Sequence, residues 1–132
     1  KEQIQEAYEK YYKDEYFIRL LALTVGGCAA VAERKVQCRI LLLPGSWEQP
    51  LPPGLTAETV ISYGLSARDS LTLSSLTEPV LCIQRQLPRP DGGHVEPQEF
   101  LLPVLPGPAE VLLPLLGVRL LQIPLDRDPF AW

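Results

Sequence analysis

The sequence contains no methionine, a single histidine and only three cysteines. It also lacks the GxxxxGK[ST] phosphate loop, the GxGxxG fingerprint, the HExxH zinc helix and the GxSxG nucleophile elbow. These absences exclude the enzyme classes that such motifs identify. Because His94 is the only histidine, a catalytic triad or a multi-histidine metal site would need residues from another chain. We therefore predict no bound cofactor and no metal, and the absences favour a non-enzymatic role.

Basic residues are few and scattered along the chain. Lysine and arginine together number 12, against 16 aspartates and glutamates, which leaves a net charge of -4 and a pI near 5.0. Proteins that bind nucleic acids contact phosphates through clustered lysine and arginine, and no such cluster occurs in this sequence. We therefore predict no nucleic-acid partner.

The cysteines Cys28, Cys38 and Cys82 have spacings that match neither a zinc site nor a dense disulfide framework. This pattern predicts buried free thiols and a reducing, cytoplasmic location.

The apolar run at residues 20–32 is shorter than the roughly 20 residues that cross a bilayer, so we predict no membrane span. Its VGGC sequence also fits a lipidation box, which leaves a tethered lipoprotein as an alternative. The acidic, tyrosine-rich segment before it is unlike the basic start of a signal peptide.

Apolar patterning predicts a single α+β domain over residues 1–132, with a helical segment at 1–34 and a sheet-forming region at 35–132. Residues 1–21 have helical spacing, and Gly26 and Gly27 are expected to end that helix. A short C-terminal helix is expected to begin at Pro108, with Pro114 kinking or shortening it. The fold class is thus an N-terminal helix packed on a mainly antiparallel sheet of five or six strands. The predicted strands are 36–43, 59–63, 70–75, 80–87, 100–104 and 118–123.

Two loops carry strong local signals. The segment SWEQPLPPG at 46–54 contains three of the chain's 14 prolines, which favour an extended, stiff arm packed against the sheet. Asp91, Gly92 and Gly93 form a turn signal between two extended runs.

Five residues are candidate contacts for a partner or ligand. Trp47 and Trp132 have the composition of an aromatic docking patch, although in a small domain such residues also cover one end of the core. Arg85 and Arg89 have the chemistry to hold a carboxylate or phosphate in a bidentate grip; the alternative is a charged strand face. His94 lies in a glycine-rich turn. It is a candidate for acid-base chemistry, and the alternative is a solvated histidine with no functional role.

The segment YEKYYKDEYFIRL, residues 8–20, resembles a stretch of the N-acetyl-gamma-glutamyl-phosphate reductases of arginine biosynthesis. In that family a tyrosine-rich helix leads into a strand that begins near the Phe-Ile-Arg sequence. The nucleotide-binding domain and the catalytic cysteine and histidine motifs of the family have no match here, so no functional residue is carried over. The resemblance implies a bacterial origin.

Residues 39–105 are similar to part of the central domain of the Mur-type amino-acid ligases. The likeness consists of the strand ILLL, a spacer and the strand end ETVISYGLS, in which Ser62, Tyr63 and Gly64 correspond to the ligases' TYG strand end. The phosphate loop, the magnesium-binding positions and the asparagine-containing helix of the ligases have no counterpart. The resemblance implies a degenerate or accessory relative in cell-wall precursor metabolism.

From these observations we predict a non-catalytic binding or accessory module, bacterial and cytoplasmic, that acts through a protein partner. The alternative is a fragment or degenerate relative of a bacterial biosynthetic enzyme, either a cell-wall amino-acid ligase or an arginine-pathway reductase. The two differ in one property. An accessory module should fold alone and show a partner, whereas a fragment should need its missing domain to stay soluble. The sequence leaves the oligomeric state and the identity of the ligand open.

Overall fold

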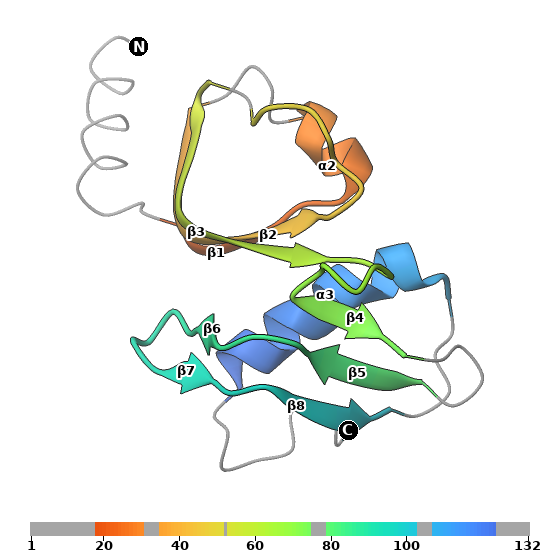
Figure 1. Cartoon of the computed structure of the whole chain (residues 1–132). Helices are drawn as coiled ribbons and strands as arrows, with labels where there is room; N and C mark the ends of the chain where they lie inside the picture. The colour runs from red at the N-terminus through yellow and green to blue at the C-terminus, as the bar shows by residue number, and fades with distance from the viewer. Residues whose placement is uncertain (1–17, 31–34, 52, 75–78, 103–106, 124–132) are drawn as a thin grey trace, which may run out of the picture.

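The computed structural model describes residues 18–30, 35–51, 53–74, 79–102 and 107–123 (Figure 1). These residues form two helices, a curled six-stranded sheet and a two-stranded sheet. In chain order the elements are β1 (Ile18–Ala22), α2 (Val25–Ala30), β2 (Val36–Pro44), β3 (Leu55–Tyr63), β4 (Leu71–Leu73), β5 (Val80–Ile83), β6 (Leu87–Pro88), β7 (His94–Val95), β8 (Gln98–Leu101) and α3 (Ala109–Gln122).

The larger sheet has six strands in the order β1-β2-β3-β4-β5-β8, and β6 and β7 form a separate two-stranded sheet. Strands β1 to β4 pair in parallel, whereas β5 is antiparallel to both β4 and β8. The predicted α+β class and C-terminal helix are therefore confirmed. The predicted mainly antiparallel arrangement is wrong, because the sheet is mixed.

The proline-rich loop explains how β2 and β3 can be parallel without a helix between them. A nine-residue strand is roughly 30 Å long, and residues 45–54 can span roughly 35 Å when extended. Proline restricts its own φ and the residue before it, which favours an extended return path. Trp47 and Leu51 pack against a buried cluster on one face of the sheet, as predicted for this loop, and its stiffness stays a prediction.

The N-terminal helix predicted for residues 1–21 is wrong at its end, because β1 begins at Ile18; residues 1–17 lie outside the described part of the chain. Leu20 and Leu21 pair with Ile40 and Leu41 of β2. A strand that is buried on both faces has apolar residues at successive positions. Over five residues this pattern also fits the apolar spacing of a helix. Gly26 and Gly27 lie inside α2 (Val25–Ala30) and do not end a helix before it.

The strand predicted for residues 118–123 is also wrong, because α3 continues to Gln122. Pro114 lies in the second turn, where its missing N–H removes only the helical bond to the carbonyl of Glu110. Tertiary packing outweighs this loss, since buried residues recur at helical spacing along α3. They are Ala109, Leu113, Pro114, Leu116, Gly117, Leu120 and Leu121. The helix ends at Ile123, whose backbone is extended, as expected for a residue that precedes a proline.

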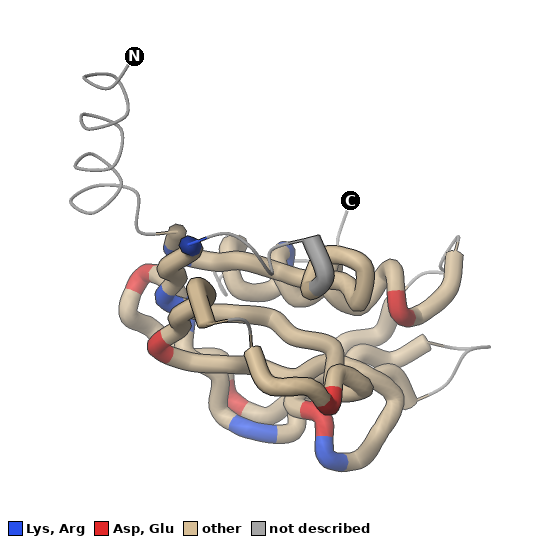
Figure 2. The backbone as a smooth tube through the Cα atoms, turned by 90° about the horizontal axis from the view of Figure 1, so that it is seen from above, with Lys and Arg blue, Asp and Glu red and all other residues tan. Residues whose placement is uncertain are grey.

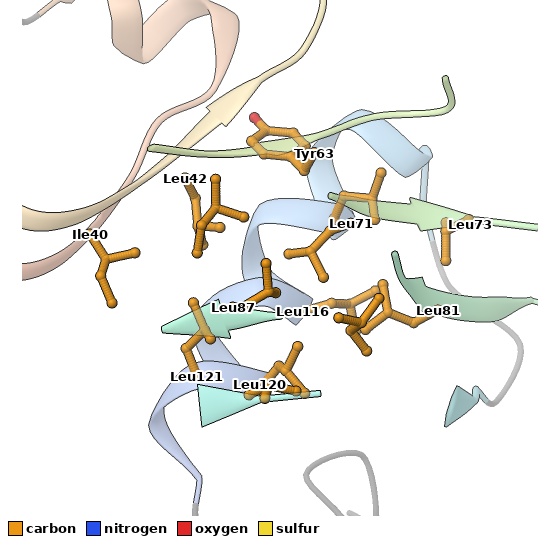
Figure 3. Close-up of a cluster of buried hydrophobic side chains, with 14 of the residues drawn as sticks. Ile40, Leu42, Tyr63, Leu71, Leu73, Leu81, Leu87, Leu116, Leu120 and Leu121 are labelled. Carbon is orange, nitrogen blue, oxygen red and sulfur yellow. The ribbon is translucent and has the colours of Figure 1, made fainter. Parts of the chain in front are cut away.

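Two apolar clusters cover the two faces of the parallel strands. The larger cluster fills the space between α3 and the sheet and includes Leu42, Leu71, Leu81 and Leu120 (Figure 3). The smaller cluster lies on the α2 side and contains Leu23, Cys28, Cys38, Leu41 and Leu55. Strand β2 contributes buried side chains to both clusters, and five of its nine residues are buried.

The segment after β5 forms a hairpin with its own turn. The predicted strand 80–87 is divided into β5 and β6, and Asp91 to Gly93 form the predicted turn between β6 and β7. Gly92 has a φ of 93°, a conformation that favours glycine, and Asp91 Oδ1 accepts a hydrogen bond of 2.9 Å from Gly93 N. After this turn β7 pairs with β6, while β8 (Gln98–Leu101) pairs with β5.

None of the described helices has the length and apolar character that a bilayer crossing requires.

Candidate functional site

A cleft of about 550 Å³ lies at the carboxyl ends of the parallel strands. Because β1, β2 and β3 run in the same direction, the loops that follow them meet at one edge of the sheet. In Figure 1 the arrowheads of β2 and β3 point toward the side on which α3 begins. The loops after the three strands and the first turn of α3 line the cleft. In open α/β sheets, ligands bind at this edge.

A buried carboxylate forms part of this edge. Asp69 is 5% exposed, and its Oδ2 accepts a hydrogen bond of 3.1 Å from Ser66 N. The carboxylate lies directly against Gly45 and Gly64, the residues that follow β2 and β3. A Cβ atom on either glycine would overlap an oxygen of Asp69. The two glycines therefore make room for the carboxylate that closes the turn after β3.

Side chains that follow β5 hold the same turn from the other side. Gln84 Nε2 donates hydrogen bonds of 2.7 Å to the carbonyl of Asp69 and 3.2 Å to that of Ala67. The guanidinium of Arg85 donates to the Arg68 carbonyl at 2.8 Å and to Ser70 Oγ at 2.9 Å. Arg85, predicted as a ligand contact, is therefore engaged with the backbone of this turn. The turn residues 65–69 are fixed at the edge of the cleft by these contacts.

Large apolar side chains are exposed around the cleft. Val25 at the start of α2, Leu65 after β3 and Val111 in the first turn of α3 all line it, and they are 54%, 61% and 49% exposed. Leu115, one helical turn beyond Val111 on α3, is 63% exposed. Exposed apolar side chains that gather at a concave site are typical of binding surfaces.

Carboxylates outnumber cations among the described residues that line the cleft. Glu48 and Glu110 are exposed and Asp69 is buried, whereas Arg68 supplies the one guanidinium there. This charge balance disfavours a phosphate-bearing ligand, which needs cations or free backbone N–H groups. Over the whole described backbone, acidic and basic positions are interspersed (Figure 2).

Tyr63 at the cleft and the two cysteines Cys28 and Cys38 are buried. Tyr63 lines the cleft, but its hydroxyl donates a hydrogen bond of 2.6 Å to the carbonyl of Leu23. Burial, followed by the proximity of Cys28, raises the pKa of Tyr63 to about 12. Burial also raises the pKa of the Cys28 thiol, and that of Cys38 to about 11. Thiols and phenols in such surroundings stay protonated and unreactive at neutral pH. No cluster of three potential metal ligands occurs among the described residues.

These pKa shifts predict a loss of stability at alkaline pH. The pKa of Cys38 is higher in the folded chain than the ordinary 9.0, so the folded state retains this proton when the unfolded state has released it. The protonated Cys38 thiol therefore makes its full contribution to stability below pH 9, and this contribution is lost as the pH rises toward 11. The free energy of unfolding, measured with urea at several pH values from 9 to 11, should fall as the pH rises. It should fall less steeply with pH for Cys38→Ala than for the wild-type chain. Equal slopes for the two proteins would contradict the assignment.

Arg89, the second predicted bidentate arginine, binds the end of α3. Its side chain is buried, and its guanidinium donates hydrogen bonds of 3.0 Å to the Leu120 carbonyl and 2.8 Å to the Ile123 carbonyl. An ion pair of 3.6 Å joins it to Asp91. The Gly93 N–H, with a smaller contribution from Arg89, lowers the pKa of the Asp91 carboxyl. Arg89 therefore caps the C-terminus of α3 and does not lie beside Arg85 in a shared site.

The remaining predicted contacts lie elsewhere. His94 is exposed on β7 opposite Pro88, and Trp47 is half-buried against the smaller apolar cluster. Trp132 lies outside the described residues. The structure thus brings none of the described candidates into the cleft. The exposed apolar residues of the cleft were not predicted from the sequence. The local sequence feature that marks the site is a glycine directly after each of two apolar strands, Gly45 after β2 and Gly64 after β3.

Comparison with known proteins finds no matching family model, no matching curated protein and no matching solved structure. The two local resemblances therefore stay predictions.

Proposed function

We propose that this chain is a non-catalytic binding module that acts through a protein partner. In this proposal the cleft at the carboxyl ends of β1, β2 and β3 receives apolar side chains of the partner. The observation that carries the proposal is the exposure of Val25, Leu65 and Val111 around a single cleft. Fully burying an exposed valine or leucine side chain contributes about 1.5–3 kcal/mol. These three side chains are about half exposed, so a partner that covers them would gain part of that amount at each.

The chemistry of the cleft favours binding over catalysis. The hydroxyl of Tyr63 is bonded to the Leu23 carbonyl, and the Asp69 carboxylate accepts from the turn backbone. Covalent catalysis usually pairs a nucleophile with a general base, and no hydroxyl donates a hydrogen bond to a carboxylate among the described residues of the cleft. Free thiols at all three cysteines support a reducing, cytoplasmic location for this module.

The shape of the apolar surface favours a protein over a small molecule. The exposed residues extend from the cleft along α3 to Leu115, beyond the volume that a compact ligand would fill. Leu115 lies one helical turn beyond Val111, so a partner segment that runs from the cleft along α3 would also cover it. Aliphatic contact of this kind, surrounded by polar groups, is typical of protein interfaces.

A second candidate rests on the position of the cleft at the carboxyl edge of parallel strands, where α/β enzymes bind small substrates. It corresponds to a degenerate relative of a biosynthetic enzyme that has kept a ligand site. Thermal-shift screening against nucleotides and cell-wall precursors tests it. A stabilisation that Leu65→Gln abolishes would favour this candidate over the protein-binding module.

The protein-binding proposal is tested by quantitative affinity capture with matched variants. We expect the tagged wild-type chain to retain a stoichiometric partner, and Leu65→Gln or Val111→Gln to reduce the retained amount about tenfold, the effect of 1.4 kcal/mol. Leu101→Gln is the control, because Leu101 is 83% exposed on β8 and does not line the cleft. Unfolding curves of each variant establish that the fold is intact. Retention that is equal in the cleft variants and the control would reject the proposal.

A further inference from the structure

We infer that the partner presents a segment in which a large apolar side chain is adjacent to a lysine or arginine. This inference rests on the proposed function, because it specifies the chemistry of the partner at the same cleft. The apolar part follows from Leu65, Val25 and Val111, which together form the exposed apolar lining. The basic part follows from the charges that border that lining.

Two exposed carboxylates come from different elements at the cleft. Glu48 lies in the loop after β2, and Glu110 lies in the first turn of α3. The buried carboxylate of Asp69 also lines the cleft, and Arg68 supplies the one cation among the described lining residues. A cationic group on the partner would be attracted to this edge, and a second anion would be repelled.

The N-terminus of α3 does not reverse this preference. The unpaired N–H groups at a helix N-terminus attract anions. Here Glu110 already places a carboxylate in that first turn, so the chain itself supplies the anion that the helix end favours. An acidic partner would have to compete with Glu110 and would also meet Glu48.

The exposed apolar side chains and the carboxylates of the cleft together match the two parts of a lysine or arginine side chain. Lysine and arginine have long apolar stems that lie along hydrophobic surfaces while their charged ends reach polar groups. A stem lying along Val111 or Leu65 would place its cation at the acidic border of the cleft. An apolar residue followed by a basic one therefore matches both parts of the surface.

The inference is tested by selecting from a random octapeptide display library on the intact chain. We expect enriched peptides to share a large aliphatic or aromatic residue next to lysine or arginine. The most enriched peptide, labelled with a fluorophore, should bind Leu65→Gln at least tenfold more weakly and Glu110→Gln about three- to tenfold more weakly. Affinity should fall as salt is raised, because exposed charges are screened. Glu99→Gln is the matched control, since Glu99 is exposed on β8 outside this cleft.

The outcomes separate this inference from the proposed function. Enriched peptides with an acidic or uncharged consensus that still need Leu65 would overturn the basic preference and support the binding cleft. Unchanged affinity of a basic peptide for Glu110→Gln and Glu48→Gln would also overturn the inference. If no enriched peptide depends on Leu65, the inference fails, and the capture experiment with Leu65→Gln decides the proposed function separately.

Discussion

Replacing Gly45 with alanine is expected to destabilise the chain by about 2–3 kcal/mol, the upper part of the range for an overpacked site. A Cβ atom at this position would overlap Oδ1 of Asp69 and lie 2.8 Å from its Cγ. Asp69 is buried and bonded to Ser66 N, so the carboxylate has little room to move. Urea unfolding of Gly45→Ala against the wild-type chain measures the loss.

A double-mutant cycle identifies the cause of that loss. In an Asp69→Ala background the overlap is removed, so Gly45→Ala should cost much less than it does in the wild-type chain. Gly26→Ala is the control, because a Cβ there would meet only Thr24 Oγ1, at 3.9 Å, and alanine favours the helix α2. A cost for Gly45→Ala that is the same in both backgrounds would contradict the proposed clash.

Replacing Arg89 with methionine is expected to cost about 3 kcal/mol. The change removes the donors that satisfy the Leu120 and Ile123 carbonyls at the end of α3, and hydrogen bonds to a charged group contribute about 1.5–3 kcal/mol each. Arg89→Lys should recover only part of the loss, because an ammonium lacks the planar fork that reaches two carbonyls. Chemical denaturation followed by the helical circular dichroism signal measures both variants.

The matched variant for Arg89 is Arg85→Met. Arg85 is exposed, so losing its bonds to Arg68 and Ser70 should cost less than half as much as losing Arg89. If Arg89→Met proved as stable as the wild-type chain and lost only partner binding, Arg89 would be a ligand contact, as the sequence alone suggested. A large loss of stability would establish it as the cap of α3.

The turn that follows β3 connects these stability effects to the cleft. Leu65 lies within the segment that Asp69 and Gln84 hold in place. Substitutions that displace the Asp69 carboxylate should therefore disturb the apolar lining as well as the fold. Leu65→Gln and Val111→Gln, by contrast, change exposed side chains and leave the contacts of Asp69 and Gln84 in place.

The elements that the sequence determined by itself are those whose causes are local. The apolar run that forms β2 (Val36–Pro44) predicts a buried strand, and Asp91 to Gly93 predict a turn, because neighbouring residues suffice to favour each conformation. The preference of the proline-rich loop for extended backbone has the same origin, since proline restricts its own φ and the preceding residue.

Only the tertiary structure decided the direction of strand pairing, the helical state of residues 118–122 and the roles of the arginines. Parallel pairing of β2 and β3 depends on a loop long enough to return along the strand, which apolar alternation does not encode. Residues 118–122 are helical because α3 packs its buried side against the sheet. Arg89 acquires its role from carbonyls more than 30 residues away, and Val25, Leu65 and Val111 meet because three chain segments end at one edge. Contacts between residues so distant in the chain arise from packing, and no local pattern specifies them.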